Sequence, residues 1–177
     1  NNLLPSRLRR AKIAIKDVVD TLRGDRVALI VFAGGVALKS PLTNDYNFFK
    51  TVLNRVSPLD INKGGSLIGD AIRFVDKTIL AKVNEQELRF QDLILITDGE
   101  DQESFPIEAA KKITEIEKNN GAQDEQVNTA SHRIRIHTVG IGSVEGSKIL
   151  IKNKDGSVKE MIKNKKGSDT PHRSVLN

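Results

Sequence analysis

The chain contains no cysteine and no tryptophan, and it has a single tyrosine among its 177 residues. The absence of cysteine excludes disulfide bonds and thiolate metal sites, and it fits any redox compartment. The scarcity of aromatic residues predicts a core of Ile, Leu, Val and Ala. The length fits one domain with a real core, and hydrophobic and charged fractions of 38% and 29% are ordinary for a globular protein.

The sequence also has no apolar run approaching the roughly 20 residues that a membrane-spanning helix needs. Its first residues lack the basic start and the apolar stretch of a signal peptide. Because it does not begin with methionine, we expect the chain to start after the start of its gene, with any signal or membrane anchor lying outside this sequence.

The net charge of +5 is located in one segment. Eight basic and three acidic residues lie between residues 148 and 173 and account for the whole excess. No aromatic residue is interleaved with them, which favours a solvated hairpin surface over a nucleic-acid groove. We therefore expect no nucleic-acid partner; an anionic membrane surface is the alternative partner for this segment.

Helical and strand patterns alternate along the chain, which predicts an α/β sheet. We expect helices over residues 8–22, 48–56, 68–79 and 107–116, and strands over residues 27–33, 36–39, 92–98 and 133–140. The apolar runs 27–33 and 92–98 are typical of strands covered on both faces. Gly34 and Gly35 predict a hairpin into a short antiparallel edge strand, and residues 153–156 predict a second hairpin between residues 149–151 and 158–162. The polar stretch 122–131 is expected to be a mobile connection.

Two polar residues are expected beyond the carboxyl ends of the strands, where loops converge and ligands bind in an open parallel sheet. Ser66 ends the loop 60–66 before a helix, and Asp98 comes directly after a strand. A hydroxyl and a carboxylate are hard oxygen ligands, suited to Mg²⁺ or Mn²⁺ rather than zinc. Spacing alone also allows simpler roles, with Ser66 as the N-cap of the helix and Asp98-Gly99 as a turn.

Six motifs follow one another along nearly the whole chain: residues 7–12 (RLRRAK), 24–34 (GDRVALIVFAG), 41–46 (PLTNDY), 64–72 (GGSLIGDAI), 96–101 (ITDGED) and 140–146 (GIGSVEG). In content and order they resemble von Willebrand factor A domains, especially the bacterial Bat A/B-type, aerotolerance-related subfamily.

The resemblance implies a metal-ion-dependent adhesion site. In that site an Asp-x-Ser-x-Ser motif, a Thr and an Asp from three loops hold a divalent cation, and a carboxylate of a partner protein completes its shell. Ser66 matches the Thr position with its hydroxyl kept, and Asp98 matches the Asp position. The cofactor expected in the intact domain is Mg²⁺ or Mn²⁺. The Asp-x-Ser-x-Ser motif is expected roughly a dozen residues before Arg7, outside this sequence, so these two ligands alone are not expected to hold Mg²⁺ well.

The implied fold is a doubly wound, Rossmann-like α/β sandwich, mostly parallel with one antiparallel edge strand. Residues 1–177 would be one partial domain without its first strand and its last helix, so the strands 27–33 and 92–98 should flank a gap or collapse together. The implied function is protein–protein recognition rather than catalysis, in a bacterial complex associated with the inner membrane through segments outside this chain. Other Bat-type subunits and a MoxR-type ATPase are the implied partners.

Other functions find less support in the sequence. The third glycine of residues 140–146 comes one place late for a dinucleotide fingerprint, and basic hairpin sequence follows it. His132, His137 and His172 lack partners at catalytic spacing, and His137 is interpreted as a packed side chain within a strand. Glu100 and Asp101 are interpreted as a solvated acidic loop. A metal-independent scaffold and a Mg²⁺-dependent phosphotransfer domain stay open as alternatives.

Overall fold

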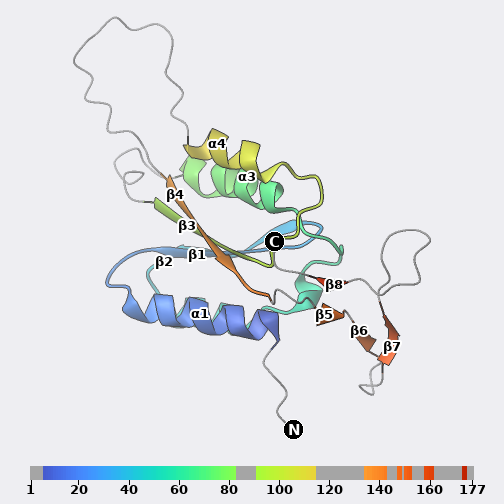
Figure 1. Ribbon diagram of the computed structural model, residues 1–177. Coiled ribbons are helices and arrows are strands. Elements are labelled where there is room, and N and C mark those ends of the chain that lie inside the picture. Colours follow the sequence, from blue (N-terminus) through green and yellow to red (C-terminus); the bar gives the residue numbers. More distant parts are fainter. Residues whose placement is uncertain are drawn as a thin grey trace, which may run out of the picture. The chain divides into compact units, whose positions relative to one another are not determined.

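The computed structural model describes residues 6–82, 91–114, 134–142, 147–148, 150–152, 158–161 and 173–174. The chain forms two compact units: one comprises Asn1–Ala11, Ile96–Glu100 and Thr138–Asn177, and the other Lys12–Leu95 and Asp101–His137. The helices are α1 (Arg7–Thr21), α2 (Tyr46–Arg55), α3 (Ile68–Thr78) and α4 (Pro106–Thr114), with short 3-10 helices η1 (Pro58–Asp60) and η2 (Leu80–Lys82). The strands are β1 (Val27–Phe32), β2 (Val36–Thr43), β3 (Gln91–Thr97), β4 (Ile134–Gly140), β5 (Ser147–Lys148), β6 (Leu150–Lys152), β7 (Val158–Met161) and β8 (Arg173–Ser174) (Figure 1).

The predicted hairpin after β1 is confirmed. Strands β1 and β2 pair antiparallel, with Phe32 opposite Val36 across the turn. Strand β2 continues to Thr43, four residues beyond the predicted end at Lys39. Pro41 is accommodated because a strand with one open edge does not need every N–H for pairing.

Strands β3 and β4 form a separate, parallel two-stranded sheet, which confirms the α/β class. Among the described strands, β1 and β3 are not hydrogen-bonded to each other; whether they flank a gap or collapse together stays a prediction. The prediction that β3 is covered on both faces was wrong. Leu95 is buried, but Asp92 and Ile94, which point to the opposite face, are exposed.

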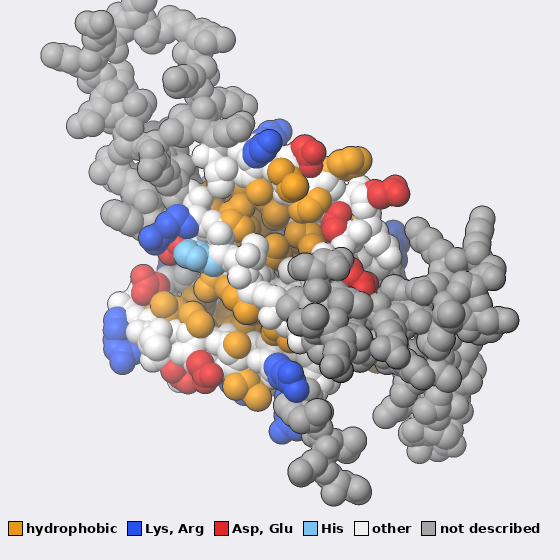
Figure 2. All heavy atoms as spheres, in the orientation of Figure 1, with side chains coloured by type: hydrophobic (Ala, Val, Ile, Leu, Met, Phe, Trp, Pro, Cys, Tyr) orange, Lys and Arg blue, Asp and Glu red, His pale blue; other side chains and the backbone are white. Residues whose placement is uncertain are grey.

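Helix α3 organises the core of the larger unit. Ile68, Ile72 and Val75 recur on one face at the spacing of helical turns, and all three are buried. The first two pack with Leu95 of β3 and Ala109 of α4. Helices α3 and α4 run side by side, and hydrophobic side chains gather along them (Figures 1 and 2). Each buried aliphatic side chain contributes about 1.5–3 kcal/mol to folding, so this layer anchors the loops at the start of α3.

The second predicted hairpin is also confirmed, because β6 and β7 pair antiparallel with Leu150 opposite Met161. The predicted connection at residues 122–131 and the predicted hairpin turn at residues 153–156 lie outside the described residues. Among the residues that the structure describes, no helix combines the length and apolar character needed to cross a bilayer.

Candidate functional site

The loop that carries Ser66 is fixed by backbone hydrogen bonds on both of its sides. On one side, Leu67 N donates to the carbonyl of Ala33 at 3.0 Å, directly after β1. On the other, Gln102 N donates to the carbonyl of Ser66 at 2.9 Å, from the loop that follows β3. The backbone of Ser66 is therefore held between two strand-end loops.

The Ser66 hydroxyl does not cap the helix that follows. Helix α3 begins at Ile68, and its N-cap residue is Leu67, which makes no side-chain capping bond. The N-cap alternative for Ser66 was therefore wrong. Within the described part of the chain the half-buried hydroxyl makes no hydrogen bond to protein, which leaves its oxygen available to an external ligand.

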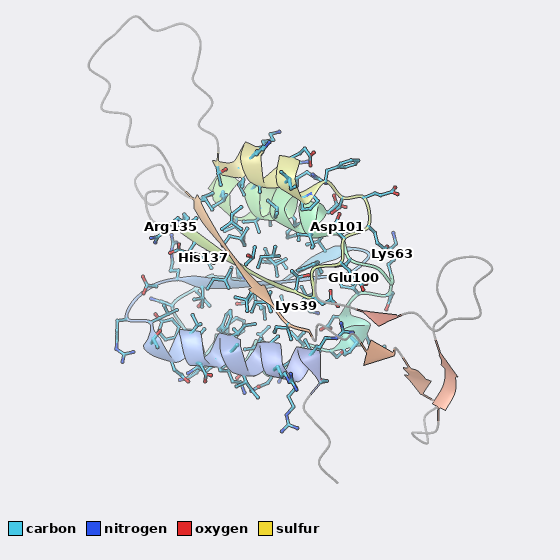
Figure 3. All side chains as sticks on the ribbon, viewed as in Figure 1. Lys39, Lys63, Glu100, Asp101, Arg135 and His137 are labelled. Carbon is cyan, nitrogen blue, oxygen red and sulfur yellow. The ribbon has the colours of Figure 1, made fainter. Side chains whose placement is uncertain are left out.

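Asp101 takes over the capping role. Its Oδ1 accepts from Ile68 N at 2.8 Å and from the Ser104 hydroxyl, and its Oδ2 accepts from Ser104 N at 2.9 Å. The interpretation of Asp101 as part of a solvated acidic loop was wrong, because the loop folds back across the first turn of α3 (Figure 3). The Asp-x-x-Ser spacing of Asp101 and Ser104, typical of local capping, was a signal that could have indicated this.

Ser104 also joins this loop to α3. Its side chain accepts from Gly69 N at 2.7 Å, and its carbonyl accepts from Arg73 Nη2 at 2.5 Å. Ser104 is only 4% exposed. Two of the backbone N–H groups that a helix start leaves without intrahelical partners are thus satisfied by Asp101 and Ser104. These bonds fasten the segment from Asp101 to Ser104 to the start of α3.

The carboxyl of Asp101 is held ionised. Its partial burial would by itself raise its pKa, but hydrogen bonds from Ser104 and Ile68 and the charge of Arg73 outweigh burial and lower the pKa below its ordinary value.

This lowered pKa predicts loss of stability in acid. The unfolded-state pKa is about 3.9, so the contribution of Asp101 is fully present above that pH and is lost as the pH falls through the lower folded-state value. We expect Asp101→Asn to be less stable at neutral pH and to lose less stability than the wild type between about pH 5 and pH 2. Urea unfolding midpoints across this range measure the difference; parallel curves for the two proteins would contradict the assignment.

Phe105, at the end of the loop after β3, and Ile107, in the first turn of α4, both carry exposed apolar side chains. Glu103 and Phe105 both have a φ of 54°, a left-handed conformation that non-glycine residues rarely adopt. Phe105 is 62% exposed and Ile107 is 67% exposed. Exposed apolar side chains on a strained and well-supported loop are typical of interaction sites.

Asp98 lies in the smaller unit, directly after β3. The carbonyl of Thr97 accepts from Ile141 N at 2.8 Å, and Gly99 adopts a φ of 87°. The Asp98 carboxylate pairs with Arg7, with Oδ2 at 2.5 Å from Nη1. The exposed fractions of these two side chains are 41% for Arg7 and 28% for Asp98. Sequence reasoning missed Arg7, because no local pattern links residues 91 positions apart.

Ser66 and Asp98 belong to different units, so their convergence stays a prediction. The described residues contain no group of three or more His, Cys, Asp or Glu side chains that could hold a metal ion. In their chemistry the two predicted ligands fit an oxygen-preferring cation: one is a hydroxyl that makes no hydrogen bond to any described residue, and the other is a carboxylate.

His137 is not a packed side chain, and that interpretation was wrong. Its side chain is 54% exposed because this face of β4 is open, and its Nε2 lies 3.0 Å from Asp92 Oδ1 (Figures 2 and 3). Arg135 pairs with the same carboxylate at 2.8 Å. Burial alone would raise the pKa of Asp92, but the hydrogen bonds from His137 and Arg135 lower it overall. In the described residues, His137 therefore belongs to a surface cluster of polar side chains around Asp92.

Comparison with known proteins shows the family. The family model described as von Willebrand factor type A domain matches residues 1–100. The chain belongs to this family. The domain resembles the crystal structure of the conserved hypothetical protein BatB from Bacteroides thetaiotaomicron, with a TM-score of 0.75 and 30% identity over 98% of this chain and 72% of that one. It also resembles an aerotolerance-related membrane protein from Bacteroides fragilis, with a TM-score of 0.67 and 30% identity over 90% of this chain and 72% of that one.

A curated relative is an uncharacterised protein of Borreliella burgdorferi, 25% identical over 153 residues. The alignment covers 85% of this chain, and the chain spans 39% of the length of that relative. Domains of this family in Bat-like proteins are, in general, protein-interaction domains.

Proposed function

We propose that the domain binds partner proteins through a divalent-metal-dependent adhesion site to which Ser66 and Asp98 contribute ligand oxygens. The observation that carries the proposal is that Ser66 has a fixed backbone and an unused hydroxyl within the described part of the chain. Its backbone is fixed between two loops, while its hydroxyl is left without a hydrogen bond in the described part of the chain. Because Asp101 performs the capping that Ser66 could have performed, the hydroxyl has no structural role in starting α3.

The second ligand is supplied by the loop after β3. Asp98 lies three residues before Asp101 in the sequence, and it carries the negative charge that a hard cation requires. Bound Mg²⁺ or Mn²⁺ would supply an electrophilic position that a partner's carboxylate completes. The exposed side chains of Phe105 and Ile107 would add apolar contact area to such a docking surface.

The setting of this function is proposed from the relatives. A structural neighbour is described as an aerotolerance-related membrane protein, which supports a membrane-associated bacterial complex as the place of action. Other Bat-type subunits and a MoxR-type ATPase are the proposed partners. We propose a binding module and not an enzyme; in the described residues, His137 contacts Asp92 and no nucleophilic side chain.

The proposal is tested by titrating Mn²⁺ into the full-length protein and measuring the free ion by electron paramagnetic resonance. Ser66→Ala and Asp98→Asn should each weaken Mn²⁺ binding by about tenfold or more, because each removes one of a small number of ligand oxygens. Asp17→Asn is the matched control, because Asp17 is exposed on α1 and removal of its charge leaves the loops unchanged. Wild-type affinity in both site variants would contradict the proposal.

A metal-independent scaffold is the second candidate function. It is favoured by one observation, the pairing of Asp98 with the guanidinium of Arg7. If a partner protein binds equally well in Mg²⁺ and in EDTA, the scaffold is correct; if EDTA abolishes binding, the adhesion site is correct.

A further inference from the structure

We propose that Arg7 is a built-in competitor for the cation at Asp98. Its guanidinium pairs with the carboxylate when no divalent ion is bound, and it must give up this contact when an ion binds. The inference rests on the proposed function, because it concerns the regulation of the same site.

The geometry makes this pairing close and reversible. Arg7 Nη1 lies 2.5 Å from Asp98 Oδ2, a close charge-assisted contact. The side chains are 41% and 28% exposed, so water and ions reach the pair. Arg7 is the first residue of α1, and the backbone beside it is fixed because Arg10 N donates to the carbonyl of Ser6 at 3.0 Å. The guanidinium can therefore move away without unfolding the helix.

Electrostatic repulsion opposes binding of the Arg7 guanidinium and a divalent cation to the Asp98 carboxylate at the same time. A guanidinium within hydrogen-bond distance neutralises the carboxylate that should attract the cation, and it also repels a divalent ion placed on the other side of that carboxylate. An exposed ion pair of this kind contributes little to stability, so a divalent ion can displace it. Cation affinity should therefore depend on the charge at position 7.

The helix offers a matched control for this charge. Arg9 and Arg10 lie in the same first turn of α1, they are exposed, and no contact of their side chains with an acidic residue is found within the described part of the chain. Arg9→Gln removes the same charge from the same end of the helix without touching Asp98. Arg7→Lys keeps the charge at position 7.

The test is Mn²⁺ titration of the full-length protein with these variants. We expect Arg7→Gln to bind Mn²⁺ about tenfold more tightly than the wild type, a conservative effect for removal of a like charge at a partly exposed site. Arg9→Gln should stay within about twofold of the wild type because the solvent screens its charge. Arg7→Lys should stay close to the wild type, and the gain should disappear in the double variant Arg7→Gln/Asp98→Asn. Thermal unfolding in EDTA confirms that each variant is folded.

The outcomes separate this inference from the proposed function. If Ser66→Ala and Asp98→Asn lose affinity while Arg7→Gln binds no tighter than Arg9→Gln, the competitor role is wrong and the adhesion site stands. If Mn²⁺ binds with wild-type affinity to Ser66→Ala and Asp98→Asn, or to no variant at all, both proposals are overturned.

Discussion

Gly69→Ala is expected to destabilise the protein by about 2 kcal/mol, the cost of overpacking less the higher helix propensity of alanine. A methyl group at Gly69 would collide with the backbone carbonyl of Ser104 and with the backbone of Phe105. These are main-chain atoms in a loop held by Asp101, so they cannot turn aside as a flexible side chain would. The loss would be measured by urea unfolding followed by circular dichroism.

Gly64→Ala is the matched control, because an added methyl group at Gly64 meets no atom within 4 Å. We expect this variant to stay within about 0.5 kcal/mol of the wild type, as most surface substitutions do. If both glycine variants lose the same free energy of unfolding, the loop at Ser104 does not pack closely against Gly69 of α3.

Asp101→Ala is expected to cost about 2–3 kcal/mol, more than an ordinary cap, since a buried hydroxyl and two N–H groups lose their acceptor together. Those donors are Ile68 N, Ser104 N and the Ser104 hydroxyl. Removal of this acceptor should also raise the rate of amide hydrogen exchange in the first turn of α3. An increase confined to that turn distinguishes local opening from global unfolding.

Glu103→Ala provides the comparison within the same loop. It removes one negative charge from an exposed side chain. Position 103 still carries a non-glycine residue at a left-handed φ, so the backbone strain there stays the same. We expect a change of no more than about 0.5 kcal/mol. If Asp101→Ala costs no more than Glu103→Ala, Asp101 is a solvated surface residue after all.

The order of helices and strands could be predicted because its signals are local. The apolar run before Gly34 and Gly35 specifies both β1 and its hairpin, and the periodic Ile and Val residues of α3 specify its buried face. The exposure of Ile94 could not be predicted, because an apolar run does not show whether anything covers its second face. Which face of β3 is exposed to solvent follows from the packing of its side chains in the structure.

Ser66 and Asp98 were predicted from the sequence because one ends a glycine-rich loop before a helix, the other directly follows a strand, and both lie in motifs that resemble those of the family; their role as cation ligands stays a prediction. The contact of Asp101 with Ile68 and that of Arg7 with Asp98 could not be predicted, because they join residues 33 and 91 positions apart; only the local Asp-x-x-Ser spacing of Asp101 and Ser104 gave a signal. The left-handed backbone at Phe105 was equally hidden, since such a conformation is normally indicated by glycine or asparagine. Local sequence reveals which side chains can bind a cation, but long-range contacts decide which of them are already occupied.

The central claim is that the Ser66 hydroxyl and the Asp98 carboxylate contribute to one cation site. The most direct measurement is an anomalous difference map from crystals of the full-length protein grown with Mn²⁺. We predict a single strong peak that both oxygens reach, either directly or through one water, with the Arg7 guanidinium withdrawn from Asp98. A peak elsewhere, or Ser66 and Asp98 at opposite edges of the molecule, would contradict the account.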